Sequence, residues 1–152
     1  MDREKELTKI SLDIQKCTLC PLAKERTNAV PGVGNPDADI VFIGEGPGAK
    51  EDASGEPFVG AAGRFLAEML GEIKMKREDV FITNVVKCRP PNNRDPLPDE
   101  VSTCTTHYLW KQLEIIDPKI IITLGRHAMH RFVPADRKIS QDLCILPDIK
   151  IA

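Results

Sequence analysis

The chain is 152 residues long, which fits one domain, and a domain of about this size buries roughly two-thirds of the surface that its unfolded chain exposes. Its 21 Lys and Arg against 23 Asp and Glu give a net charge of -2, so the chain as a whole does not attract nucleic acid and any DNA contact needs a local basic face. No apolar run reaches the roughly 18 residues that cross a bilayer, and the first residues do not resemble a signal peptide. We therefore expect a soluble, cytoplasmic monomer whose five cysteines are reduced rather than disulfide-bonded.

Helical and strand patterns alternate along the chain. Apolar residues at helical spacing predict an opening helix around residues 7–14, which runs into a turn containing Cys17 and Cys20. The later patterns predict strands at 39–43, 80–83 and 119–125, and helices at 60–70, 98–116 and 126–132. This order predicts a three-layer α/β/α sandwich around a mainly parallel sheet, with a ligand site at the carboxyl ends of the strands.

The whole chain, residues 1–152, is expected to form a single domain whose last ~20 residues are atypical. Within residues 133–152, three isoleucines can supply an edge strand, but two prolines and the lack of clear caps weaken that pattern.

The cysteines suggest a site with four thiolates. The Cys17-x2-Cys20 pair lets two thiolates converge on one ion or cluster, and Cys88 and Cys104 can supply the other two. The fifth cysteine, Cys144, is not part of this set. Zinc and an iron-sulfur cluster both accept four thiolates, and the absence of a second Cys-x2-Cys pair favours the cluster only slightly. The alternative is that the cysteines are separate, small, buried hydrophobic residues.

Several residues that suit catalysis or base binding lie near the predicted strand ends. Residues 44–48 (GEGPG) follow the first strand, where glycines let the backbone approach a ligand, but the Lys-Ser/Thr ending of a phosphate-binding loop is absent. Glu45 and Glu51 place carboxylates there, and one of them can activate or orient a water molecule. Phe58 can stack on a base, and the amide of Asn84 can read a pyrimidine edge. Each of these residues also has an ordinary role in a loop, a turn or packing.

A local basic segment follows the second strand. Lys87, Arg89 and Arg94 surround a rigid Pro-Pro-Asn-Asn sequence, and such a loop can meet DNA phosphates or can simply be a solvated turn. The three histidines, His107, His127 and His130, are expected to be surface or structural residues.

Taken together, these segments resemble the family 4 uracil-DNA glycosylases, the iron-sulfur branch of the uracil-DNA glycosylase superfamily. The resemblance extends from about Leu7 to Met129 and depends on the order and spacing of several motifs rather than on one of them. They are Cys17-x2-Cys20, residues 44–48 with Glu51 and Asp52, 57–60 (PFVG), 82–91 (ITNVVKCRPP), 96–100 (PLPDE), Cys104 and 124–125 (LG).

The resemblance implies a role for each of these positions. It implies that a [4Fe-4S] cluster is held by Cys17, Cys20, Cys88 and Cys104. It also implies that Phe58 stacks on an extruded uracil, that Asn84 reads the polar edge of the base, and that the backbone of Gly46 faces it. Glu45 is the first candidate for the carboxylate that positions the hydrolytic water, with Glu51 as a second or supporting group.

The resemblance does not cover the end of the sequence. Family members continue to a further strand and a loop with a His-Pro-Ala-type motif, whose histidine stabilises the leaving uracil anion, and that motif is not found before Ala152. We expect a monofunctional uracil-DNA glycosylase that acts on uracil-containing DNA in base excision repair. The alternatives are a noncatalytic iron-sulfur module that binds DNA or uracil, and a zinc-stabilised α/β protein that binds a small nucleotide.

Overall fold

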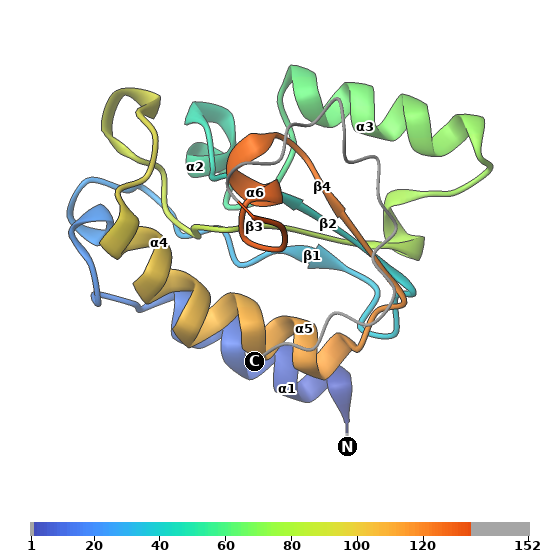
Figure 1. Cartoon of the computed structure of the whole chain (residues 1–152), viewed down its shortest axis with the longest axis horizontal. Helices are drawn as coiled ribbons and strands as arrows, with labels where there is room; N and C mark the ends of the chain where they lie inside the picture. The colour runs from blue at the N-terminus through green and yellow to red at the C-terminus, as the bar shows by residue number, and fades with distance from the viewer. Residues whose placement is uncertain (1, 135–152) are drawn as a thin grey trace.

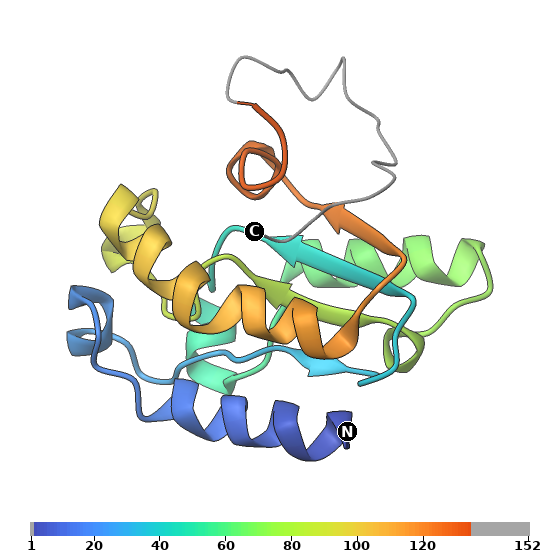
Figure 2. The ribbon, with the colours of Figure 1, turned by 60° about the horizontal axis from the view of Figure 1, so that its bottom comes forward.

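The structure is a computed structural model that describes residues 2–134, and it contains a four-stranded sheet between two layers of helices (Figures 1 and 2). The strands are β1 (Val33–Gly34), β2 (Ile40–Gly44), β3 (Phe81–Asn84) and β4 (Ile120–Thr123). Their spatial order is β1-β3-β2-β4, in which β2 pairs in parallel with both β3 and β4, whereas β1 pairs antiparallel with β3. The prediction of a mainly parallel sheet is confirmed.

The helices cover both faces of this sheet. They are α1 (Arg3–Gln15), α2 (Ala49–Ser54), α3 (Ala61–Glu72), α4 (Pro98–Cys104), α5 (Trp110–Ile116) and α6 (Arg126–Met129), with 3-10 turns at Pro21–Lys24, Arg77–Asp79 and Pro91–Asn93. Neighbouring side chains of a strand point to opposite faces, so Val41 and Ile43 pack in the core formed with α1 and α5, while Phe42 packs with Leu66 and Leu70 of α3. The two cores confirm the predicted three-layer α/β/α sandwich.

Local sequence explains where the main helices begin and end. The Asp2 carboxylate accepts a hydrogen bond from the backbone N–H of Lys5 and caps α1. Proline at the first position of α4 suits a helix start, because its missing N–H would have no partner there. The single helix predicted over residues 98–116 is instead α4, a π-helical turn at Thr105–Leu109, and α5.

Two elements were not predicted from the sequence, β1 and α2. β1 has only two residues, too few for a periodic pattern, and Gly34 within it has φ +136 and lies so close to β3 that a Cβ would be 2.0 Å from the Val80 carbonyl oxygen. Helix α2 has six residues and directly follows the glycine- and proline-rich turn, which resembles a loop. The possible edge strand at residues 145–151 lies outside the described residues.

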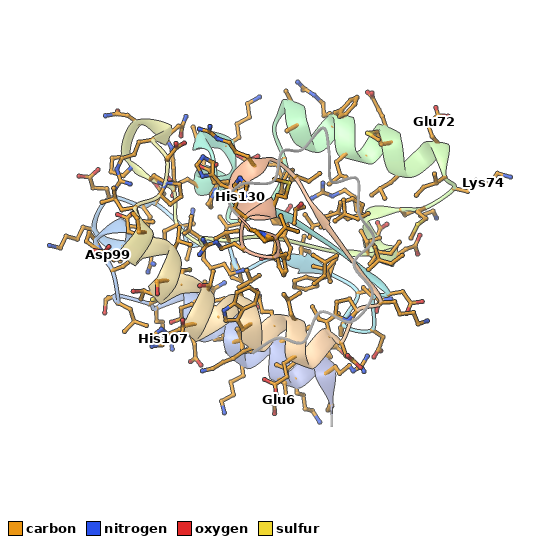
Figure 3. All side chains as sticks on the ribbon, viewed as in Figure 1. Glu6, Glu72, Lys74, Asp99, His107 and His130 are labelled. Carbon is orange, nitrogen blue, oxygen red and sulfur yellow. The ribbon has the colours of Figure 1, made fainter. Side chains whose placement is uncertain are left out.

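Charged side chains such as Glu6, Glu72, Lys74 and Asp99 are exposed at the periphery of the molecule (Figure 3). None of the helices in the described part of the chain has the length and apolar character needed to cross a membrane.

Candidate functional site

The carboxyl ends of β2 and β3 bring together the residues expected to bind a base. The register pairs Gly44 with Asn84, so the segments that follow both strands start at the same edge of the sheet. A Cβ on Gly44 would lie 2.5 Å from Cζ of Phe58 and 2.6 Å from Oδ1 of Asn84. The absence of a side chain at Gly44 therefore lets an aromatic ring and an amide meet above the strand end.

The side-chain amide of Asn84 makes no hydrogen bond to another described residue. The residue as a whole is 2% exposed, and its backbone carbonyl accepts a hydrogen bond from Lys87 Nζ, but the amide makes no hydrogen bond within residues 2–134. The amide atoms are not fully buried, since Nδ1 of His130 is the one fully buried side-chain polar atom without a partner among the described residues. A ligand beside the Phe58 ring would supply the missing donor and acceptor.

Phe58 is held in a strained loop by charged side chains on both sides. Its φ of 52 places a non-glycine residue in the left-handed region, which costs of order 1 kcal/mol or more and persists only where surrounding contacts enforce it. Arg77 provides two of these contacts, because its Nη1 and Nη2 donate to the carbonyl oxygens of Phe58 and Pro57 at 2.9 and 2.7 Å. Helix α3 provides another, because the Phe58 carbonyl packs directly on Gly63.

Glu51 holds the other side of the same loop. One of its carboxylate oxygens accepts hydrogen bonds from the N–H groups of Val59 and Gly60, both at 3.1 Å, and the second accepts from Gly48 at 3.2 Å. Both oxygens therefore bind backbone, which suits a supporting group more than one that activates water.

Glu45 lies at the start of the turn after β2 and faces α6. Burial raises the pKa of its carboxyl above the ordinary value, while the positive charge available on His127 opposes that shift. Nε2 of His127 is 3.5 Å from a Glu45 oxygen and 3.3 Å from an oxygen of Asp95, and Arg126 approaches Asp95 at 3.8 Å. His127 was expected to be a surface or structural residue, yet it lies against the candidate catalytic carboxylate.

The place of His127 just after a predicted strand could have indicated its position. α6 begins shortly after β4, and the carboxyl end of β4 lies at the same edge of the sheet as those of β2 and β3. Gly46 lies close to the segment that follows β3, since a Cβ there would be 2.8 Å from Cγ2 of Val86.

The structure separates the three basic residues expected to meet DNA. Nε of Arg89 donates to the side chain of Asn93 at 2.8 Å, and Arg94 makes a two-pronged ion pair with Glu100 at 2.8 and 2.9 Å while its own side chain stays 36% exposed. Lys87 is 1% exposed and its ammonium binds protein acceptors, so it cannot reach a DNA phosphate in this structure. The expectation for Lys87 is wrong, because a basic residue beside a turn can also point inward.

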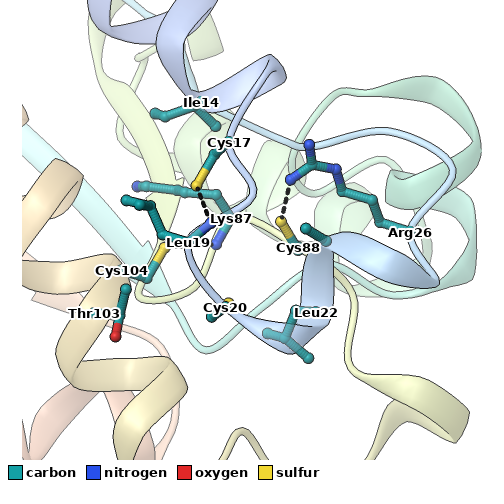
Figure 4. Close-up of a pocket in the computed structure, with 11 residues that line it drawn as sticks. Ile14, Cys17, Leu19, Cys20, Leu22, Arg26, Lys87, Cys88, Thr103 and Cys104 are labelled. Carbon is teal, nitrogen blue, oxygen red and sulfur yellow. Dashed lines mark hydrogen bonds between the residues drawn. The ribbon is translucent and has the colours of Figure 1, made fainter.

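The four cysteines line one pocket although they come from three distant segments (Figure 4). Cys17 and Cys20 follow α1, Cys88 follows β3, and Cys104 is the last residue of α4. None of the four forms a disulfide. The empty space beside the cysteines amounts to about 330 Å³ when the part open to solvent is counted.

Cationic and backbone donors surround the sulfur atoms. Nη1 of Arg26 donates to Sγ of Cys88 at 3.0 Å, and the backbone N–H of Lys87 donates to Sγ of Cys104 at 3.3 Å. Burial raises the pKa of the Cys88 thiol, an effect that Arg26 opposes, and raises that of Cys104 to about 11. Such thiols stay protonated unless a positive group binds them.

The spacing of the sulfur atoms bears on what they can bind. Four thiolates around one zinc ion, each about 2.3 Å from it, would lie roughly 3.8 Å apart. Although all four cysteines are among the described residues, no three of their sulfur atoms lie within 4.8 Å of one another. As placed here, the four sulfur atoms are spaced more widely than the thiolates around a single zinc ion.

Comparison with known proteins agrees with this geometry. Residues 31–148 match the family model described as the uracil DNA glycosylase superfamily. The chain is 60% identical over 122 residues to the type-4 uracil-DNA glycosylase of Archaeoglobus fulgidus, an alignment that covers 80% of this chain and 61% of that protein. It is 53% identical over 138 residues to the Thermotoga maritima protein of the same name, covering 91% and 71%, and 58% identical over 123 residues to that of Sulfurisphaera tokodaii, covering 80% and 56%. The chain thus spans little more than half to about seven-tenths of the length of these relatives.

Proposed function

The chain belongs to the uracil DNA glycosylase superfamily, and we propose that it is a type-4 uracil-DNA glycosylase that hydrolyses the N-glycosidic bond of uracil in DNA during base excision repair. The observation that carries the proposal is the side-chain amide of Asn84, which makes no hydrogen bond within residues 2–134 and lies with the Phe58 ring against Gly44. An aromatic face and an amide that both donates and accepts are complementary to a pyrimidine ring.

The base must first leave the DNA stack, because a glycosylase cannot reach its target atom inside a duplex. Unstacking costs a few kcal/mol and is easiest for a mispaired base such as uracil opposite guanine. In the pocket, Phe58 stacks on the extruded uracil. The Asn84 amide donates an N–H to O4 and accepts the N3–H through its oxygen, while the backbone at Gly46 borders the ring.

The bond then breaks with positive charge on the sugar and negative charge on the departing uracil. Glu45 is ionised in this role: its carboxylate stabilises the sugar cation, orients a water molecule and takes a proton from it as the water oxygen bonds to C1′. The electrons of the broken C1′–N1 bond leave with uracil, the uracil anion then takes up one proton, and an abasic site remains. Glu51 takes no part in this chemistry but holds the loop that presents Phe58.

Arg89 and the exposed part of Arg94 are the groups proposed to meet DNA phosphates beside the pocket. Cys17, Cys20, Cys88 and Cys104 would hold a [4Fe-4S] cluster, which when bound supplies a covalent tie between three segments of the chain. This tie connects the segment after α1, the segment after β3 and the end of α4.

The proposal is tested by uracil release from a duplex with one U·G pair, using folded, iron-loaded protein. We expect release by the native chain, and a rate roughly 10²–10³-fold lower for Glu45→Gln and for Asn84→Ala. Glu68→Gln, at an exposed carboxylate of α3, is the matched control and should match the native rate. Binding of the uracil-containing duplex without release of uracil would favour the noncatalytic alternative. If the protein shows no binding and no release, the proposal is refuted.

A further inference from the structure

Lys87 is the most deeply buried charged group in the described chain, and every donor of its ammonium is used. Nζ donates to Oγ1 of Thr83 at 2.6 Å, to Oε1 of Gln112 at 2.7 Å and to the backbone carbonyl of Asn84 at 2.9 Å. Thr83 and Gln112 in turn both donate to the carbonyl oxygen of Pro31. Since an ammonium has three N–H donors, this network is closed and leaves none for DNA.

The three acceptors of this ammonium are neutral, and no carboxylate in residues 2–134 lies within ion-pair distance of it. A buried cation without an opposite charge is strongly unfavourable. The backbone N–H of Lys87 donates to the sulfur of Cys104 at 3.3 Å, and Cys88 is the next residue in the chain. Lys87 also lines the cysteine pocket.

The same side chain also contacts the end of the strand that carries Asn84. It donates to the Thr83 hydroxyl and to the Asn84 carbonyl oxygen, which belong to the last two residues of β3, and the amide of Asn84 lies beside Gly44 and the Phe58 ring. One side chain therefore contacts the end of the strand that presents Asn84, while its backbone contacts a cysteine of the other site.

We propose that Lys87 is the internal counter-cation of the four-cysteine site and couples that site to the position of Asn84. Thiolates that hold an iron-sulfur cluster carry negative charge, and this charge stabilises the buried ammonium. The ammonium in turn holds the end of β3 through Thr83 and the Asn84 carbonyl. Lys87 is thus a positioning residue, and its effect on uracil binding rests on the function proposed above.

The charge is tested by the midpoint potential of the iron-loaded protein, measured without uracil or DNA. Removing a nearby positive charge disfavours reduction of a cluster, because reduction adds negative charge. In Lys87→Met we expect the equilibrium constant for reduction of the cluster to be about tenfold smaller than in the native protein. For one electron, this corresponds to a midpoint potential about 59 mV more negative. Lys87→Arg should retain a potential close to the native one, and so should Lys111→Met, which removes an exposed lysine next to Gln112. Equal potentials for Lys87→Met and Lys111→Met would overturn the proposal.

The coupling is tested by the dissociation constant of free uracil, measured by calorimetry. Thr83→Val keeps the cation and removes one of its acceptors, so we expect the native potential together with roughly tenfold weaker uracil binding. Thr105→Val is the matched control, because the Thr105 hydroxyl is buried but donates only within its own helical run. Unchanged uracil affinity in Thr83→Val would refute the coupling, and this variant keeps the test valid if Lys87→Met does not fold.

The two proposals fail in different ways. If the native protein does not bind uracil, the proposed function fails, while the potentials of Lys87→Met and Lys111→Met still decide whether Lys87 is the counter-cation. If the native protein binds uracil and those two potentials are equal, only the role of Lys87 is overturned.

Discussion

Two glycines of helix α3, Gly63 and Gly71, should respond to alanine with opposite signs. A Cβ on Gly63 would lie 1.7 Å from the carbonyl oxygen of Phe58, whereas a Cβ on Gly71 would meet nothing within 4 Å. Both positions lie in the same helix, so the intrinsic preference for alanine over glycine, up to about 1 kcal/mol, is shared. The difference between the variants therefore isolates the contact between α3 and the Phe58 loop.

The structure sets the size of this difference. Ordinary contact with a Cβ begins at 3.4 Å, so in Gly63→Ala the helix and the loop must separate by more than about 1 Å. Such overpacking typically costs about 1–3 kcal/mol, and the displaced Phe58 carbonyl would also lose its bond from Arg77. We expect Gly63→Ala to lower the free energy of unfolding by roughly 1–3 kcal/mol and Gly71→Ala to raise it by about 0.4–1 kcal/mol.

Activity should separate the two variants further. A misplacement of about 1 Å can cost roughly 10²-fold in rate, so uracil release by folded Gly63→Ala should fall by about that factor, while Gly71→Ala should retain the native rate. The assays are urea denaturation at constant iron content and single-turnover uracil release. If Gly63→Ala is as stable and as active as Gly71→Ala, the loop that carries Phe58 does not depend on α3 and the reasoning is wrong.

Three further predictions concern the pH profile, the cysteines and acid stability. Burial raises the pKa of Glu45, and His127 opposes that shift, so uracil release by the native protein should fall as the pH drops through this pKa. In a single-turnover pH profile, His127→Ala should move this fall to higher pH. An unmoved profile would show that His127 does not act on Glu45. Cys88→Ser should lose iron and visible absorbance while Cys144→Ser keeps both, and retention of both in Cys88→Ser would contradict the four-thiolate site. The hydrogen-bonded ion pair with Arg94 lowers the pKa of Glu100, so its contribution to stability is present above the ordinary glutamate pKa and is lost as the pH falls through the lowered value. Arg94→Met should therefore reduce the acid-side slope of the unfolding free energy, and an unchanged slope would count against this pair.

The supporting contacts explain why the residues proposed to bind the base need not lie close in sequence. Glu51 and Arg77 belong to different elements, yet both hold the loop that contains Phe58. Both side chains hold Phe58 through backbone N–H and C=O groups of the loop. Every residue has these groups, so the residue types in the sequence do not reveal such contacts. We infer that substitutions at Glu51 act on the position of Phe58.

Much of the fold was predictable because it depends on local patterns. β-branched runs marked β2, β3 and β4, since buried strands of a parallel sheet are apolar on both faces. The parallel pairing of such strands then places their carboxyl ends at one edge, which is why Glu45 and Asn84 could be assigned to one candidate site. The short elements β1 and α2 lacked a periodic pattern, and their positions depend on contacts with β3 and with the loop that follows.

Local spacing and motif order were enough to predict the family, the order of the layers and the residue types at the strand ends. The directions of individual side chains became visible in the folded chain alone. The tertiary structure turned Lys87 into the core, brought His127 of α6 against Glu45, and placed sulfur atoms from three segments around one pocket. A side chain turns toward the acceptors and charges that surround it, and those neighbours come from distant parts of the chain.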